Sequence, residues 1–469
     1  QLDPDLTPNL AAFAGESTWF RGHTTNAVWT TEAVPSLLTG RYPESAEENA
    51  LWFDHPDNLF RVLASTHKLQ VDEVLTQLCP PTICSISDRS GDGSRPEPDP
   101  AWRRLTGDAR TVVSQRIWPW SEPESIGLNQ FADTGGGVAV FEGDGAVDVI
   151  DPVAQFFGMI PATQPARFAD FLDAMDPGTA ERPGAFFFHL VLPHQPWTFR
   201  ADGSDRGEVD KSYLGFGGEE TVADEPYAVA VGRDLHLDQV TYTDGLVGSF
   251  LNRLDEIGIY DDTTVVIVAD HGVSFVPGTN EREIGPANAA EVLPTPLFVK
   301  YPGQIEGEIV DGTVEIIDVL PMVEEGVGVT VPWEYDGVTV GERGSELRYF
   351  DDDEGIETLD HPELMAHLQA GVAFDQSPER VLADNNLTVD QAIAVPDAEP
   401  IEVEVPLRDH LTSTAPEGVV ALGLIVNDDL VAVGMAAASG KVVVPVPEEF
   451  WGTSPAGVRL VPVAPGPGD

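Results

Sequence analysis

Residues 263–272 read TTVVIVADHG, a β-branched apolar run that ends in an aspartate, a histidine and a glycine. A continuous apolar run of this kind is typical of a strand that is buried on both faces of a sheet. Catalytic groups of open α/β sheets lie just beyond the carboxyl ends of the strands. We therefore expect Asp270 and His271 at a functional edge, where a carboxylate beside an imidazole is suited to binding a divalent metal ion.

Similar apolar runs lie on both sides of this segment. AFFFHLVL occupies 185–192, a long helix is expected at about 234–257, the strand at 263–269 follows that helix, and PLFVK is a third strand at 296–300. A strand, a helix and a second strand in this order predict a right-handed parallel unit. His194 follows the first strand closely, so we expect it at the same edge as the aspartate and histidine above.

A threonine is expected at the start of a helix near the beginning of the chain. Residues 26–43 read NAVWTTEAVPSLLTGRYP. Pro35 is tolerated in the first turn of a helix that begins one or two residues after Thr30, and Gly40 is suited to ending it. Thr30 then lies at a helix N-terminus, where backbone N–H groups and the positive end of the helix dipole favour phosphoryl oxygens.

The chain is strongly acidic, with 25 basic and 79 acidic residues among its 469 and a formal net charge of -54. Electrostatic repulsion disfavours direct binding to nucleic acid or to an anionic membrane surface. A surface of this kind stays soluble in high salt, which indicates a marine or salt-adapted source. The 42% hydrophobic content supports a packed core. No run of 18 apolar residues occurs, so no segment is expected to span a bilayer as a helix.

The chain has two cysteines, Cys79 and Cys84, in the run LCPPTICS. They could be free thiols or half of a metal site, but their position around a Pro-Pro turn favours a local disulfide. A disulfide indicates an extracytoplasmic location, because it persists in oxidising compartments.

Composition divides the chain into a large α/β domain at 1–340, which carries the candidate catalytic residues, an acidic connector at 341–394 and a small β-rich domain at 395–469. Within the first part, residues 85–184 are rich in Gly, Pro and Asp and are expected to form an insertion and connecting loops. In the last part, VVALGLIVNDDLVAVG at 419–434 predicts two strands around an Asn-Asp-Asp turn.

Five segments of the chain resemble, in order, successive blocks of the sulfatase family. They are TPNLAAFA, VPSLLTGRYP, YTDGLVGSFLNRL with VVIVADHG, TPLFVKYPG and EIIDVLPMV, and they span about residues 7–325. Five blocks in the right order are much more specific than any single motif. The resemblance implies an α/β fold, the alkaline-phosphatase-like three-layer sandwich with a mostly parallel central sheet.

The resemblance also identifies a candidate nucleophile. In formylglycine sulfatases a cysteine lies eleven residues before the arginine of the LLTGR block, and the corresponding residue here is Thr30. Threonine cannot be converted to formylglycine. The spacing resembles instead the phosphoethanolamine transferases and the lipoteichoic acid synthase-like phosphoglycerol transferases, branches of the superfamily that use threonine. This likeness implies phosphorus chemistry through a phosphothreonine intermediate, with Thr31 as the alternative nucleophile.

Further roles follow from the same resemblance. The groups implied to hold a divalent metal ion, whether Mn, Zn, Mg or Ca, are Asp270, His271 and the hydroxyl of Thr30. The residues implied to border or bind the substrate are His194, Arg282 and Asn288. The alternative for His194 is a loop histidine packed on Trp197. His236 and Asp244 lie on the long helix and are expected to be structural.

The leading hypothesis is a metal-dependent phosphotransferase or phosphodiesterase that acts on a cell-envelope lipid or polymer. One alternative is a hydrolase that releases sulfate or phosphate from a soluble ester, and another is a catalytically inactive envelope-binding module. Relatives carry acidic metal ligands on a strand upstream of the TPNL block, where only Gln1 to Leu6 stand here. We therefore expect a longer native chain, with an upstream membrane anchor and the enzyme outside the cytoplasm.

Overall fold

The computed structural model describes residues 2–45, 49–84, 152–207, 213–214, 216, 222, 224–285, 287–344, 346–351, 355–360, 377–396 and 398–466. No described helix is both long enough and apolar enough to cross a lipid bilayer.

The first part of the chain is a mixed α/β unit. Its α-helices are α1 (Pro8–Phe13), α2 (Thr30–Thr39), α3 (Leu59–Thr66), α6 (Pro152–Asp173), α7 (Pro226–Glu256), α8 (Ala289–Val292) and α9 (Val319–Val327). Its strands are β1 (Thr18–Phe20), β2 (His23–Thr24), β3 (Lys68–Asp72), β4 (Gly184–Phe188), β5 (Val265–Val268), β6 (Leu297–Lys300), β7 (Glu308–Val310) and β8 (Val314–Glu315). The three apolar runs thus form β4, β5 and β6, and the predicted long helix is α7, which begins earlier than expected.

The described strands of this part pair in both directions, and three of their five pairings are parallel. One four-stranded sheet has the order β5–β6–β1–β7, in which β6 is antiparallel to both neighbours and β7 is parallel to β1. The pairs β3–β4 and β2–β8 are parallel. Among the described residues β4 pairs with β3 and β5 with β6, so the expected parallel unit does not appear as a β4–β5 pairing. Between β5 and β6 the only described helix is α8, with four residues, which is too short for a parallel crossover.

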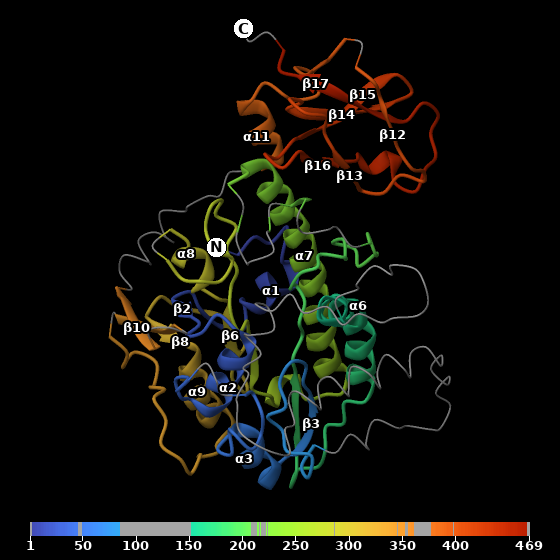
Figure 1. The fold of residues 1–469 in the computed structure, drawn as a ribbon. Coiled ribbons are helices and arrows are strands. Elements are labelled where there is room, and N and C mark those ends of the chain that lie inside the picture. The colour runs from blue at the N-terminus through green and yellow to red at the C-terminus, as the bar shows by residue number, and fades with distance from the viewer. Residues whose placement is uncertain are drawn as a thin grey trace, which may run out of the picture.

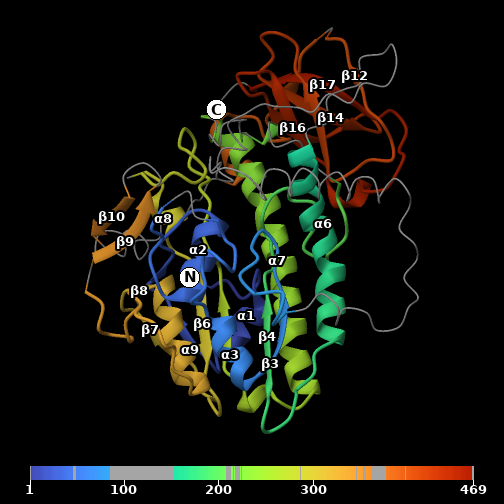
Figure 2. The same ribbon diagram turned by 60° about the horizontal axis from the view of Figure 1, so that its bottom comes forward.

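Helices cover both faces of this sheet and form the expected three-layer sandwich. Phe298 of β6 packs in one core cluster with residues of α1, α6 and α7. Its neighbours Leu297 and Val299 pack in another cluster, with residues of α9. This alternation follows from the two-residue period of a strand. α2 and α3 share a core cluster with Leu320 of α9, and Figure 2 shows them on the side of the sheet away from α7.

The helix that carries the candidate nucleophile begins at Thr30 itself, with Trp29 as its N-cap. Pro35 therefore lies inside the helix, and its predicted place in the first turn is wrong. Its ring removes the N–H that would otherwise bond to the carbonyl of Thr31. Gly40 ends the helix in the left-handed conformation, with φ of 70°, as predicted.

The expectation of loops throughout 85–184 is wrong for the end of that range. Residues 152–173 form the 22-residue helix α6. Two internal prolines, Pro161 and Pro165, weaken the helical signal of this sequence, which explains why it reads as a loop. Residues 85–151 lie outside the described part of the chain.

The last part of the chain is rich in β-structure, as predicted. Its elements are α11 (Pro378–Asp384), β11 (Ile393–Ala394), β12 (Ile401–Glu402), β13 (His410–Thr414), β14 (Ala421–Val426), β15 (Asp429–Met435), β16 (Lys441–Pro445) and β17 (Arg459–Ala464). β14 and β15 form the predicted hairpin, and its turn residues Asn427 and Asp428 both have positive φ, as a tight two-residue turn requires. Figure 1 shows this part in red, at the N-terminal end of α7. The acidic connector contains a further hairpin, of β9 (Glu346–Asp351) and β10 (Gly355–Asp360).

Candidate active site

Thr30 and Asp270 lie side by side, although 240 positions separate them in the sequence. The Thr30 hydroxyl donates to Asp270 Oδ2 over 2.7 Å and lies 3.4 Å from His271 Nε2. The first turn of α2 presents the hydroxyl, and the segment after β5 presents the aspartate and the histidine. Thr31 lines a separate cavity of about 140 Å³ beside α2. Of the two candidate nucleophiles, Thr30 is therefore the one whose hydroxyl contacts Asp270.

Local hydrogen bonds orient Asp270 and His271. The backbone N–H of His271 donates to Asp270 Oδ1 over 2.9 Å, and His271 Nδ1 lies 3.0 Å from the Gly272 carbonyl. Because a carbonyl only accepts, Nδ1 carries the ring proton and Nε2 keeps its lone pair on the side of Thr30. Burial would raise the pKa of Asp270, but His271 and His189 lower it to about 2. Burial lowers the pKa of His271, so the pair is a carboxylate beside a neutral imidazole at pH 7.

Three donor atoms of this site fit a metal ion. Asp270 Oδ2, His271 Nε2 and Thr30 Oγ1 are separated by 2.7, 3.4 and 3.7 Å. Ligand atoms at metal distances of about 2.0–2.2 Å lie roughly 3 to 3.5 Å apart, so these atoms fit one face of a coordination sphere. Within the described ranges no group of three His, Cys, Asp or Glu side chains completes it. The described residues therefore supply a partial ligand set.

Arg282 lies between His271 and His194. Its Nη2 donates to His194 Nε2 over 2.8 Å, while its Nη1 lies 3.2 Å from the Val28 carbonyl and 3.4 Å from His271 Nε2. The guanidinium also lies over the ring of Trp29, 4.4 Å from the centroid, in cation–π geometry. Trp29 is the N-cap of α2, so the segment that presents the candidate nucleophile also fixes this cation.

His194 faces Arg282 as a neutral acceptor. Its Nδ1 lies 2.6 Å from the Gln195 carbonyl, which places the ring proton on Nδ1 and the lone pair on Nε2. Burial and the positive charge of Arg282 lower the pKa of His194 to about 3. Trp197 packs its ring on those of Phe216, His236 and Phe275. The ring of His194 thus contacts the Gln195 carbonyl and Arg282, and Arg282 in turn lies beside His271.

Asn288 is occupied by contacts to its own loop. Its Oδ1 accepts from the backbone N–H of Gly285 over 2.7 Å, and its Nδ2 donates to the carbonyls of Asn280 and Glu283 over 3.0 and 2.9 Å. These bonds close the loop that carries Arg282. A direct contact between Asn288 and a substrate stays a prediction.

His236 and Asp244 have the structural contacts expected of the long helix. Asp244 accepts from the backbone N–H groups of Asn9 and Leu10 and from the side-chain amide of Asn9, over 2.8 to 2.9 Å. It thereby caps the N-terminus of α1 from α7. His236 packs against Phe275, and burial lowers its pKa to about 4.

His189 is a further histidine at the end of a strand, for which the sequence analysis makes no prediction. It follows β4 directly, its Nδ1 contacts the Val74 carbonyl, and it lowers the pKa of Asp270. An imidazole immediately after an apolar strand is the signal that could have found it, because the same pattern identifies His271. Earlier in the chain, before β4, Cys79 and Cys84 form a disulfide.

Part of the sequence is similar to known proteins. The sulfatase family model matches residues 120–328, a stretch that includes His194, Asp270 and Arg282 but not Thr30. Over 100 residues, 21% of the chain, the sequence is 35% identical to the multifunctional alkaline phosphatase superfamily protein PehA of Trinickia caryophylli. Over 102 residues, again 21% of the chain, it is 29% identical to an endo-4-O-sulfatase of Bacteroides thetaiotaomicron. The matches span 19% and 20% of the lengths of these two relatives.

Among solved structures, the chain is similar to the phosphonate monoester hydrolase SpPMH from Silicibacter pomeroyi. The TM-score is 0.43 at 16% identity, over 73% of this chain and 74% of that one. The stretch that matches the family model includes the segments that present His194, Asp270 and Arg282. Residues 120–328 of the chain are therefore similar to the sulfatase family.

Proposed function

We propose that the chain is a metal-dependent phosphotransferase or phosphodiesterase that uses Thr30 as its nucleophile. The observation that carries this proposal is the position of the Thr30 hydroxyl, 2.7 Å from Asp270 Oδ2 and 3.4 Å from His271 Nε2 at the N-terminus of α2. A hydroxyl is a weak nucleophile at neutral pH and needs such partners to become reactive.

The reaction has two steps. In the first, Thr30 Oγ1 bonds to the phosphorus of the ester, the bond from phosphorus to the leaving alcohol breaks, and that alcohol leaves with the proton that the threonine loses. In the second, water or an acceptor alcohol attacks phosphorus, and the Thr30 Oγ1–phosphorus bond breaks with return of a proton to the hydroxyl. The outcome is hydrolysis with water and transfer with an alcohol.

The surrounding residues stabilise the charge that develops on the transferred group. Arg282 supplies a fixed cation, and the N-terminus of α2 supplies backbone N–H groups and the positive end of a ten-residue helix. A divalent ion held by Asp270, His271 and Thr30 would lower the pKa of the hydroxyl and polarise a phosphoryl oxygen.

We further propose a cell-envelope lipid or polymer as the substrate and a location outside the cytoplasm. The disulfide between Cys79 and Cys84 supports that location, because disulfides persist in oxidising compartments. The strongly acidic composition disfavours close approach to an anionic membrane surface. The proposed enzyme would therefore be held at the envelope by an anchor and not by its own surface charge.

A sulfate-ester hydrolase is the second candidate, because the matching family model is that of the sulfatases. Sulfate and phosphate esters place similar tetrahedral anions at the nucleophile. With a phosphodiester the transferred phosphoryl group keeps one nitrophenyl ester and is heavier than a transferred sulfo group, so the mass added to the enzyme distinguishes the two reactions.

Intact mass spectrometry tests the proposal. The protein is incubated with Mn²⁺ or Zn²⁺ and bis(nitrophenyl) phosphate, and in parallel with nitrophenyl sulfate, and each reaction is quenched in acid. Thr30→Ala is compared with Thr31→Ala, a matched control one residue away whose hydroxyl faces a different cavity. We expect a nitrophenyl-phosphoryl adduct in wild type and in Thr31→Ala, and none in Thr30→Ala.

Other outcomes change the conclusion. An adduct that persists in Thr30→Ala and disappears in Thr31→Ala would move the nucleophile by one residue. Turnover of the sulfate ester alone would favour the sulfatase reading. Absence of both adduct and turnover with each metal ion would refute the enzymatic proposal and favour a binding module.

A further inference from the structure

The C-terminal β-rich part packs directly against the loops of the candidate site. Val443 of β16 belongs to the same buried cluster as Trp197, which lies three residues after His194, and Phe275, which lies between Asp270 and Arg282. The Tyr227 hydroxyl, at the start of α7, donates to the Val433 carbonyl of β15 over 3.1 Å. Both active-site loops thus share a core with the C-terminal sheet.

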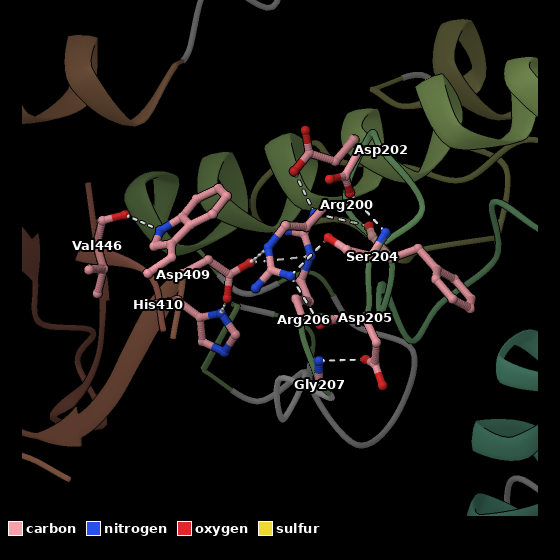
Figure 3. A network of polar contacts seen from close by, with 12 residues as sticks. Arg200, Asp202, Ser204, Asp205, Arg206, Gly207, Asp409, His410 and Val446 are labelled. Carbon is pink, nitrogen blue, oxygen red and sulfur yellow. Dashed lines mark hydrogen bonds and ion pairs between the residues drawn. The ribbon is translucent and has the colours of Figure 1, made fainter. Parts of the chain in front are cut away.

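A buried charge network joins the two parts at one point. Asp409, just before β13, lies 3.3 Å from Arg200 Nε and 3.5 Å from Arg206 Nε. The side chains of Asp409 and Arg206 are only 6% and 1% exposed, so this contact is screened little by solvent. Figure 3 shows the aspartate pointing toward both arginines, with His410 donating to its other oxygen over 2.7 Å.

A second contact fixes Arg200 from the same side. Its guanidinium lies over the ring of Trp451, 4.8 Å from the centroid, and the indole N–H of that tryptophan donates to the Val446 carbonyl over 2.7 Å. On the other side, Arg200 Nη1 donates to Ser204 Oγ and to the Asp205 carbonyl over 3.1 and 3.0 Å. The C-terminal part therefore holds both ends of the turn at 200–206.

Hydrogen bonds run from this turn to His194. Arg206 Nη2 donates to the Phe199 carbonyl over 3.0 Å, and the Phe199 N–H donates to Gln239 Oε1 over 3.2 Å. Gln239, fully buried on α7, then donates through Nε2 to the His194 carbonyl over 2.8 Å. His194 in turn contacts Arg282. An unbroken series of contacts thus connects Asp409 with the cation at the candidate nucleophile.

We propose that Asp409 is a positioning residue for the active site, through which the C-terminal domain fixes the loop at 193–207 and with it the pairing of His194 and Arg282. A buried carboxylate between two guanidinium groups has few alternative positions, because a displacement moves it away from at least one of these cations in a low-dielectric interior. Arg206 also pairs with Asp238 of α7 over 2.5 Å, so the same guanidinium joins the C-terminal domain to that helix. The C-terminal domain is then a component of the catalytic machinery. The activity readout of this proposal rests on the proposed function, whereas its structural readout does not.

The test compares Asp409→Asn with Asp428→Asn. The second variant is a matched control, because Asp428 pairs with Arg459 over 3.1 Å in the same domain but is exposed and far from the loop. The thermal unfolding midpoint, kcat and KM for bis(nitrophenyl) phosphate, and hydrogen exchange of the peptide at 193–207 are measured for each. We expect Asp409→Asn to lower kcat by about tenfold with a smaller change in KM, to speed exchange at 193–207, and to leave exchange in α1 unchanged.

A double variant separates positioning from folding. Arg206→Met with Asp409→Leu removes the two most buried charges together, and buried ion pairs replaced by apolar side chains commonly leave a protein folded. Arg200 keeps its hydrogen bonds to Ser204 and the Asp205 carbonyl, and Asp238, the other partner of Arg206, is half-exposed. We expect this variant to fold with faster exchange at 193–207 and reduced kcat, because it lacks the directional contacts. Wild-type exchange and kcat in Asp409→Asn and in the folded double variant would overturn the proposal. If wild type turns over no ester, the proposed function fails, and the exchange measurement still decides whether Asp409 positions the loop.

Discussion

Replacing Arg282 by methionine tests the electrostatic part of the proposed reaction. The guanidinium donates to His194 Nε2 over 2.8 Å and lies 3.2 Å from the Val28 carbonyl, with Trp29 beneath it. Loss of one fixed donor to a developing negative charge costs about 3 kcal/mol, which corresponds to a fall in kcat of roughly a hundredfold. Lysine should restore only part of the rate, because a single ammonium cannot reproduce the planar fork that spans both acceptors.

The same substitution should also change the pH dependence. Burial and the Arg282 charge together hold the pKa of His194 at about 3. Without the arginine, burial, which is the largest cause, and the neighbouring His271 still lower the pKa of His194, so this pKa rises only part of the way toward the ordinary value of about 6.5. A larger fraction of His194 is then protonated at mildly acidic pH, so the acid limb of the rate profile should move to higher pH.

The assay is steady-state hydrolysis of bis(nitrophenyl) phosphate from about pH 5 to 9 at fixed metal concentration. Arg21→Met is the control, since Arg21 forms an exposed pair with Asp311 that lies outside the candidate site. Rates of Arg282→Met within twofold of wild type, with an unchanged acid limb, would refute the reasoning.

Three further predictions concern stability. Burial lowers the pKa of the fully buried His23 to about 4, so the unfolded chain binds more protons between about pH 4 and 6.5 and stability falls as the pH drops through that window. In His23→Gln the free energy of unfolding, measured in urea, should change by roughly 2–3 kcal/mol less across this pH window than in wild type. An unchanged pH dependence of this free energy would contradict the prediction. Asp244→Ala should cost about 2–4 kcal/mol in thermal unfolding, because it leaves the first N–H groups of α1 uncapped, while turnover per folded molecule stays the same; a kcat defect at full stability would argue for a catalytic role instead. Reduction of the Cys79–Cys84 disulfide should lower the guanidinium unfolding free energy by about 2 kcal/mol, and equal curves with and without reductant would show that the crosslink adds nothing.

The sequence was informative where a short segment determines its own structure. Apolar runs ending in polar groups predict β4, β5 and β6, and Gly40 predicts the end of α2. The meeting of Thr30 with Asp270 is a contact between distant segments, and it could be predicted only because the order of five blocks resembles a family with known geometry. Composition or periodicity alone would have left Thr30 as an ordinary residue at a helix start.

The expectations that differ from the structure involve information outside the local pattern. β6 runs antiparallel to β5 because the described connection between them contains only the four-residue helix α8, which is too short for a parallel crossover. The apolar pattern of each strand alone carries no information about that connection. The local pattern predicts Pro35 in the first turn of a helix. Packing of α2 against α3 and α9 instead tolerates this proline in the helix interior. In the same way, α6 forms in spite of two prolines, since helix propensity is a weak constraint when tertiary contacts are available.

The contact between Asp409 and Arg206 illustrates why a charge count does not predict where charges act. A net charge of -54 opposes the approach of any two parts of this chain, and repulsion between exposed groups weakens as salt rises. Arg200 and Arg206 lie on the catalytic side of the interface and face Asp409 of the C-terminal part. These ion pairs attract the two parts at one point, whereas the net charge of the whole chain repels them. Because Arg206 and Asp409 are almost fully buried, their attraction is screened far less than the surface repulsion. High salt should therefore favour the docked arrangement, and a docking contact of this kind would keep the active-site loop in place under conditions that weaken ordinary surface ion pairs.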